Sequence, residues 1–174
     1  MYRILTLTAL VVSLAAAQEG QSANPLSNDV RSMWKQVQGN VLKSAEKMPE
    51  EHFNFKPVDS VRTFGALLGH VADANYSICG MAKAEKPPVS GIEKSKTARG
   101  DVIDALKASF AYCDTAYSAL TDKTAVESVK WFRGERTRAA ALMGNTMHDI
   151  EHYGNMVTYM RMKGIVPPSS EPRQ

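Results

Sequence analysis

Two histidines near the C-terminal end of the chain have the spacing of a metal site. His148 and His152 stand four residues apart within the stretch Met147–Asn155, which reads MHDIEHYGN. An α-helix turns once every 3.6 residues, so side chains four positions apart lie above one another on one face. Two imidazoles in this arrangement can bind one metal ion, although ordinary surface or core histidines also show this spacing by chance. A third histidine on another helix would favour the metal site.

His70 is the residue best placed to supply that third ligand. A helix is predicted from its N-cap at Thr63 to about Lys83. His70 lies at the margin of the apolar face of this helix, from which a side chain can reach a neighbouring helix. Taken alone, its position fits a boundary histidine that bonds to a backbone carbonyl better than it fits a metal ligand. The remaining histidine, His52, has acidic neighbours in a connector, and we expect it to be a solvated surface residue.

Four stretches of the chain have the apolar period of an α-helix. They cover about residues 25–48, 63–83, 101–120 and 138–163. The connectors at 50–57, 85–99 and 121–135 are rich in turn residues and are predicted to be loops. We find no strand pattern and no internal repeat. The prediction is an all-α four-helix bundle, in which sites are built from side chains on facing helices.

The first 17 residues have the layout of a secretory signal peptide. Arg3 gives a positive start, residues 4–16 form a mostly apolar run that is short for a membrane span, and Ala15–Ala17 supply small residues for cleavage. An uncleaved amphipathic start is the alternative. We expect a periplasmic or extracellular protein with no membrane anchor after cleavage. Residues 18–24 would be a flexible lead-in, 25–164 the single domain, and 165–174 a mobile C-terminal tail.

Composition and charge exclude other classes of protein. With 44% hydrophobic and 22% charged residues, the chain is globular rather than disordered. Its net charge is +3 with both signs interspersed, which argues against the concentrated basic face of a nucleic-acid-binding protein. The two cysteines, Cys79 and Cys113, can form one disulfide in an oxidising compartment. Two buried thiols in apolar helices fit the sequence equally well.

The order and spacing of these motifs resemble those of the DinB-like, YfiT-related superfamily. Two positions depart from the family pattern, because Tyr153 stands where arginine is common and Asn155 where glutamine is common. Neither departure removes a ligand, but both bear on the surroundings of the site and on substrate preference. The matching segments span nearly all of the mature chain and are Phe55–Pro57, Thr63–Val71, His148–Asn155, Tyr159–Gly164 and Pro167–Pro168.

The resemblance implies an up-down-down-up bundle in which His70, His148 and His152 bind a divalent metal, often nickel or zinc. Three neutral imidazoles leave a coordination position for water or a thiolate, whose pKa the ion lowers. Relatives look to include thiol-dependent transferases and an isomerase that uses a low-molecular-weight thiol. We therefore expect a metal-dependent enzyme of thiol-transferase or hydrolase type with an unknown small-molecule substrate. The alternative is a non-enzymatic bundle that is stabilised by metal or binds a small molecule, and either form could be a homodimer.

Three further residues are candidates for orienting the histidines. The helical angle of Asp149 points its side chain toward the apolar centre, where it could accept a hydrogen bond from a ligand histidine. Asn155 and Tyr159 share the half-polar stripe of the histidine pair. Asp149 also replaces the glutamate base of the zinc-protease motif HExxH, which argues against a protease. A closed, structural site would need a fourth protein ligand, such as Asp73, Asp149 or a cysteine.

Overall fold

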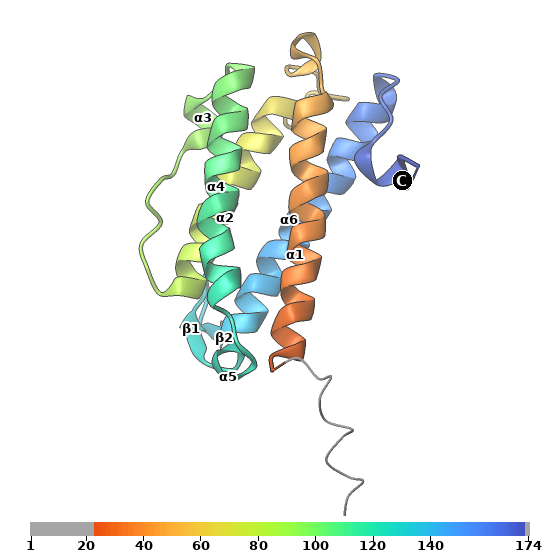
Figure 1. Cartoon of the computed structure of the whole chain (residues 1–174). Helices are drawn as coiled ribbons and strands as arrows, with labels where there is room; N and C mark the ends of the chain where they lie inside the picture. Colours follow the sequence, from red (N-terminus) through yellow and green to blue (C-terminus); the bar gives the residue numbers. More distant parts are fainter. Residues whose placement is uncertain (1–22, 173–174) are drawn as a thin grey trace, which may run out of the picture.

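Four long helices form the body of the protein (Figure 1). The structure is a computed structural model that describes residues 23–172, so the predicted signal peptide and nearly all of the predicted lead-in lie outside the described residues. The helices run up, down, down and up, because the long connection after α2 returns the chain to the top before α4 begins. This confirms the predicted four-helix bundle and its topology. The helices are α1 at Pro25–Lys47, α2 at Phe64–Lys83, α4 at Arg99–Ala119 and α6 at Arg138–Met162.

Local sequence sets the ends of the two helices that carry the three histidines. Thr63 and Thr137 cap α2 and α6, since the side chain of each accepts a hydrogen bond from the backbone N–H three residues on. At the other end of α6, Gly164 adopts the left-handed conformation with a φ of 71°, which stops the helix. These signals fix where each histidine falls along its helix.

A continuous apolar core joins the four helices. Trp34 on α1 is fully buried and stacks on Tyr117 of α4 with ring centroids 4.4 Å apart. The ring of Phe110, also on α4, lies tilted against Trp34 with a centroid distance of 5.3 Å. Cys79 on α2 and Cys113 on α4 form a disulfide with Cα atoms 5.3 Å apart. Of the two alternatives that the sequence leaves open for the cysteines, the structure therefore has the disulfide.

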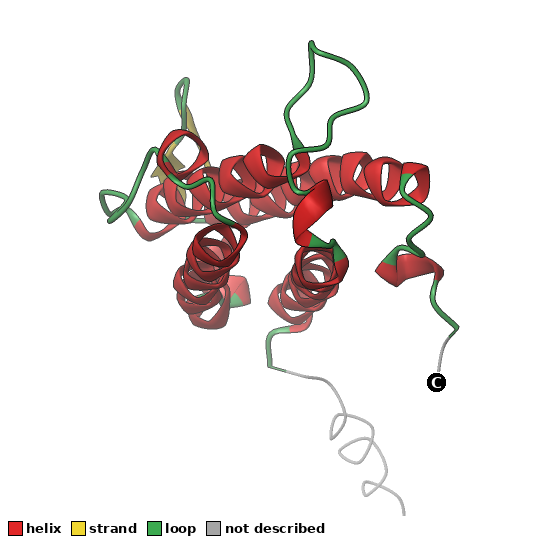
Figure 2. Cartoon of the chain, turned by 90° about the horizontal axis from the view of Figure 1, so that it is seen from above, coloured by secondary structure: helices red, strands yellow, loops and turns green. Residues whose placement is uncertain are grey.

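Two connectors contain structure that the sequence pattern does not predict. The connection at 85–99 includes a one-turn helix, α3, at Ile92–Ser95. The connection at 121–135 leads through helix α5 at Asp122–Ala125 into an antiparallel hairpin of β1 at Ser128–Lys130 and β2 at Glu135–Thr137. Figure 2 shows these strands at one corner of an otherwise helical molecule. The expectation of no strand is wrong here, because three-residue strands are too short to show an alternating pattern.

The segment after α6 packs against the bundle, although the sequence predicts a mobile tail from residue 165. Its 3₁₀ turn, η2 at Pro168–Ser170, lies beside α6, where the hydroxyl group of Tyr153 bonds to the Ser169 side chain at 2.7 Å and accepts the Ser169 backbone N–H at 2.9 Å.

A second 3₁₀ turn, η1 at Glu50–His52, follows α1. Within residues 23–172, no helix is both long enough and apolar enough to cross a membrane.

Candidate metal centre

The side chains of His70, His148 and His152 meet between α2 and α6. The Nε2 atoms of His70 and His152 each lie 3.1 Å from Nε2 of His148, and one ligand nitrogen of each residue lies within 4.8 Å of the other two. Metal–nitrogen bonds of about 2.0–2.1 Å place two ligand nitrogens roughly 3 Å apart. The structure therefore brings together the three histidines that were expected to be ligands, at a spacing that suits one shared ion.

Hydrogen bonds on the far sides of two rings show how their nitrogens are used. Nδ1 of His70 lies 3.1 Å from a carboxylate oxygen of Glu93, and Nδ1 of His148 lies 3.3 Å from one of Asp149. An ionised carboxylate can only accept, so each Nδ1 carries the proton and each Nε2 presents a lone pair. Two lone pairs that face each other at 3.1 Å repel. A cation between them would remove that repulsion, so the donor set fits a metal ion.

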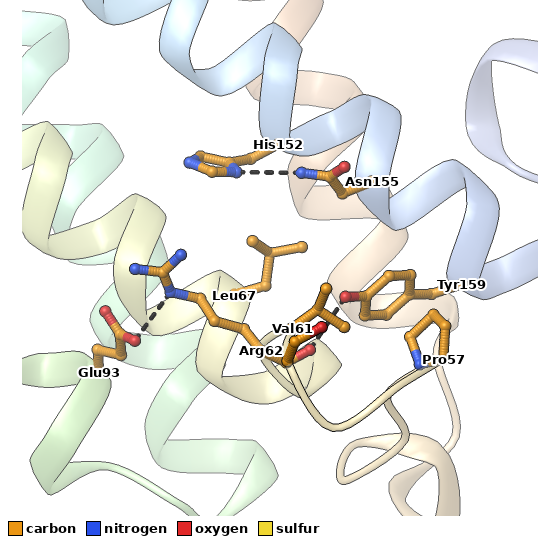
Figure 3. Close-up of a pocket in the computed structure, with 9 residues that line it drawn as sticks. Pro57, Val61, Arg62, Leu67, Glu93, His152, Asn155 and Tyr159 are labelled. Atoms are coloured by element: carbon orange, nitrogen blue, oxygen red, sulfur yellow. Dashed lines mark hydrogen bonds and ion pairs between the residues drawn. The ribbon is translucent and has the colours of Figure 1, made fainter.

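Asn155 and Tyr159 play different parts beside the centre. The side-chain amide nitrogen of Asn155 lies 3.4 Å from Nδ1 of His152, to which it can donate a hydrogen bond (Figure 3). The hydroxyl group of Tyr159 instead donates to the backbone carbonyl of Arg62 at 3.0 Å. Asp149 and Asn155 thus lie where they can orient a histidine, as the sequence suggests, whereas Tyr159 fixes the chain just before α2.

Burial sets the protonation of the groups around the centre. Burial, followed by the positive charges of neighbouring residues, lowers the pKa of His152 to about 4 and lowers that of His70, so both imidazoles are neutral at pH 7, as ligation requires. Asp149 is fully buried, and desolvation raises the pKa of its carboxyl group to about 6. Its Oδ2 has no hydrogen-bond partner within residues 23–172. A metal ion on the adjacent histidine would supply the positive charge that this carboxylate lacks.

Glu93 is a site residue that the sequence pattern misses. It lies on α3, in the connection that was expected to be a loop, and its carboxylate bridges two groups. One oxygen faces His70, and the other accepts a hydrogen bond from Nε of Arg62 at 2.9 Å. Burial alone would raise the pKa of Glu93, but the hydrogen bonds and charges of Arg62 and His70 outweigh it and lower the pKa. Glu93 is therefore ionised and able to hold the His70 ring.

Two residues of α2 hold α3 against the centre. Asp73 accepts hydrogen bonds from the backbone N–H groups of Ile92 and Glu93, both at 2.9 Å. A Cβ atom at Gly69 would lie 2.8 Å from the Cα atom of Glu93, so only glycine allows this close approach. Asp73, which the sequence offers as a fourth ligand, thus has both carboxylate oxygens engaged by α3.

Comparison with known proteins places this geometry in a family. Residues 33–156 match the sequence model of the DinB superfamily. The chain belongs to this superfamily. The match covers most of the chain and includes all three histidines, so it confirms the resemblance that the motifs suggest. No curated protein matches the sequence significantly.

Solved structures share the fold of this DinB-superfamily protein. A DinB-like protein from Bacillus cereus has a TM-score of 0.71 and 19% identity, over 81% of this chain and 95% of that one. The DinB-like protein YjoA from Bacillus subtilis has a TM-score of 0.68 and 21% identity, over 84% and 100%. A mycothiol-dependent maleylpyruvate isomerase has a TM-score of 0.57 and 14% identity, over 75% of this chain but 60% of the isomerase. At these identities, the similarity establishes the fold alone.

A cavity of about 540 Å³ opens beside the histidines of the DinB-superfamily bundle (Figure 3). His152 forms part of its wall, so a small molecule bound there would lie next to the centre. Its volume is in the range of pockets that hold small ligands. Its lining comes from the segment before α2 and from α2, α3 and α6, and consists of Pro57, Ser60, Val61, Arg62, Leu67, Glu93, His152, Asn155 and Tyr159.

Replacing Glu93 with glutamine is expected to weaken zinc or nickel binding by about 10–100-fold, the usual effect of losing an acceptor behind a ligand histidine. The neutral amide is a weaker acceptor for the Nδ1 proton of His70 and leaves the ring less well oriented. Competition with a chelator of known affinity measures the change. Glu151→Gln is the matched control, because Glu151 is exposed on α6 beside His152. Equal affinities in the two variants would contradict the assigned role of Glu93.

Two opposing titrations predict how pH acts on the metal-free protein. The pKa values of His70 and His152 are lower in the folded state than in the unfolded chain. Below a pH of about 6.5, the unfolded chain therefore binds more protons at these residues than the folded state does, and the free energy of unfolding falls as the pH drops toward 4. Asp149 acts in the opposite direction, because its pKa of about 6 lets the folded state bind a proton before the unfolded state does. We expect Asp149→Asn to remove this compensation and to steepen the loss of stability between pH 6 and pH 4.

Urea unfolding in the presence of a chelator, repeated across this pH range, measures the slope. The control is Asp59→Asn, because the Asp59 side chain is fully exposed and should leave the slope unchanged. The comparison uses slopes rather than absolute stabilities, so a constant loss of stability in Asp149→Asn does not affect it. If Asp149→Asn and wild type lose stability in parallel, the carboxyl group of Asp149 does not titrate as its burial indicates.

Proposed function

We propose that this protein is an exported metal-dependent enzyme that activates a nucleophile at a three-histidine centre. The observation that carries the proposal is the convergence of three Nε2 atoms, two of them from rings whose Nδ1 protons are held by carboxylates. We take the ion to be zinc or nickel, because imidazole suits both. The substrate is a small molecule that enters the adjacent cavity.

The number of protein ligands supports a catalytic rather than a structural site. The other residues that could supply a fourth ligand are engaged elsewhere in the described part of the chain. Asp73 caps α3, Cys79 and Cys113 form the disulfide, and Asp149 lies at Nδ1 of His148, away from the converging nitrogens. Three histidines with a remaining open position are the usual arrangement of catalytic zinc, whereas structural zinc has four protein ligands.

The chemistry follows from this arrangement. A divalent ion at the centre would lower the pKa of a water or thiol at its open position and make it a nucleophile near neutral pH. The chain's own residues keep the ligands in place, since Glu93 holds His70 and Asp149 holds His148 through their Nδ1 protons. A thiol is supported by the shared fold with a mycothiol-dependent isomerase. Water is supported by export, because the thiol cofactors of the cytosol are scarce outside the cell.

Export has two lines of support. Residues 1–17 have the pattern of a signal peptide, and the disulfide between Cys79 and Cys113 is typical of an oxidising compartment. Mass spectrometry of the protein recovered from a secreting host tests this part of the proposal. We expect a mature chain that begins at Gln18. A full-length chain that stays in the cytosol would contradict it.

Cobalt substitution tests the catalytic centre. We expect freshly purified protein to contain about one equivalent of divalent metal, and the cobalt(II) form to show a visible spectrum that changes when azide or 2-mercaptoethanol is added. Such a change means that an exogenous ligand reaches the ion. Protein that binds neither its native metal nor cobalt would refute the proposal. Bound cobalt whose spectrum responds to neither ligand would indicate the alternative, a closed and structural site.

A further inference from the structure

Arg62 provides the positive charge in the wall of the cavity beside the centre. Its guanidinium group donates from Nε to Glu93, and within residues 23–172 it makes no other side-chain hydrogen bond. Figure 3 shows the guanidinium group between the carboxylate of Glu93 and the ring of His152, with its terminal nitrogens on the side that faces His152. These nitrogens carry four N–H donors that face the cavity without a partner from the described chain. The cavity therefore contains, next to the histidines, a pair of guanidinium nitrogens that can donate hydrogen bonds to a ligand.

Both the backbone and the side chain of Arg62 are held in place by hydrogen bonds. The hydroxyl group of Tyr159 donates to the backbone carbonyl of Arg62 at 3.0 Å, and Glu93 fixes the side chain at 2.9 Å. The Glu93 carboxylate cannot serve the cavity as well, because its second oxygen is bound to His70. An arginine fixed in this way loses little conformational entropy when a ligand binds. The arrangement is that of a prepared binding group, linked through one carboxylate to a ligand of the centre.

We propose that Arg62 binds a carboxylate group of the substrate and that the substrate is a small monocarboxylate whose other end reaches the open position of the centre. This inference rests on the proposed function. The two terminal nitrogens of a guanidinium group match the two oxygens of a carboxylate with parallel hydrogen bonds. The charge balance favours a monoanion over a phosphate dianion, because Arg62 is the single cationic side chain among the lining residues and Glu93 offsets part of its charge.

The remaining walls suit a short carbon chain between the two ends of such a molecule. Pro57, Val61 and Leu67 give the cavity an apolar side, while Ser60 and Asn155 add hydrogen-bonding groups. A ligand that spans the cavity would therefore bury its aliphatic part and pair its charged end. Apolar walls with a few polar groups are typical of small-molecule sites.

Cobalt-loaded protein allows a direct test with probe molecules. The first probes are mercaptoacetate, 3-mercaptopropionate and 4-mercaptobutanoate, which carry a thiol for the metal and a carboxylate for Arg62 at increasing separations. The second are the corresponding amides, which have the same lengths and no charge. Thiolate binding to cobalt(II) is followed by its absorption band. For at least one length, we expect the wild-type protein to bind the acid about 10–100-fold more tightly than its amide.

In Arg62→Gln, we expect the ratio of the affinity for the acid to that for the amide to fall to about 1, while the affinity for the amides stays nearly unchanged. Arg62→Lys should retain part of the preference for the acid. The control is Arg133→Gln, because Arg133 lies exposed in the hairpin away from the cavity, and it should keep the full preference. A wild-type protein without preference at any length, or a preference that survives in Arg62→Gln, would overturn the inference.

Two further outcomes are distinguishable from these. In the first, inorganic phosphate competes with 3-mercaptopropionate more strongly than propionate does, and this advantage of phosphate is lost in Arg62→Gln. Arg62 would then bind phosphate, and the carboxylate assignment would be wrong. If no thiol of either series alters the cobalt spectrum, the open position itself does not exist, and the proposed function fails together with this inference.

Discussion

Replacing His148 with alanine is expected to weaken metal binding at the candidate centre by orders of magnitude. His148 is the central ligand, since its Nε2 lies 3.1 Å from Nε2 of both His70 and His152. Without it, one nitrogen remains on each of two helices. Zinc sites with four ligands bind with about 10–16 kcal/mol, so one ligand contributes about 2.5–4 kcal/mol. We therefore expect the affinity for zinc or nickel to fall by roughly 1000-fold, which corresponds to about 4 kcal/mol.

The matched control is His52→Ala, which removes a histidine that lies outside the cluster, at the end of η1. Calorimetric titration and chelator competition measure the affinity of both variants. Thermal unfolding adds a second measurement, because a ligand that binds only the folded state raises the melting temperature. Added metal should stabilise the wild-type protein and His52→Ala but not His148→Ala. One equivalent of metal bound by His148→Ala with near wild-type affinity would mean that the three histidines do not share an ion.

Part of this centre can be predicted from sequence alone. The pair His148 and His152 follows from a spacing of four residues within one helix, which needs no tertiary information. The third ligand does not, because nothing local to His70 shows that α2 packs against α6. That step came from the resemblance to the superfamily, and the packing of α2 on α6 then confirmed that His70 meets the other two. The spacing of residues along the chain does not show which helices pack together, and that packing decides whether the third histidine reaches the other two.

Glu93 shows why a connector can hide a site residue. Its helix has a single turn, and one turn is too short for apolar periodicity to reveal it in a stretch rich in lysine. Its position depends on two residues about 20 positions earlier, since Asp73 caps α3 and Gly69 leaves space for its backbone. A single aspartate or a single glycine in a helix can have many structural roles, so neither residue alone predicts this contact from the sequence. Only their combination in three dimensions places a carboxylate behind His70.

The C-terminal segment gives a similar lesson about a departure from the family pattern. Tyr153 stands where the superfamily commonly has arginine, and the sequence suggests a consequence for the surroundings of the site. In the structure, its hydroxyl group instead bonds to the side chain and backbone of Ser169. This position therefore holds the chain after α6 against the bundle. Composition alone indicates a mobile tail, because a few specific hydrogen bonds leave no periodic trace in a polar sequence.

Removing the disulfide by Cys79→Ala and Cys113→Ala together is expected to lower the free energy of unfolding by about 3–4 kcal/mol. The bond joins residues 34 positions apart and restricts the unfolded chain accordingly. Both cysteine side chains are fully buried, so the double variant also loses packing between α2 and α4. Urea unfolding of the oxidised wild-type protein and of the double variant, both with chelator, measures the difference. Equal stabilities would show that this bond contributes nothing to the fold.

The same variant separates the stability of the bundle from the integrity of the centre. The disulfide ties α2 to α4, whereas the histidines lie between α2 and α6, so metal affinity should change by only a few-fold. The Glu93→Gln variant should show the opposite pattern, with weaker metal binding and little loss of stability. If the double cysteine variant lost metal binding as severely as His148→Ala, the position of His70 would depend on the covalent link to α4. The centre would then form only in an oxidising compartment, where this disulfide persists.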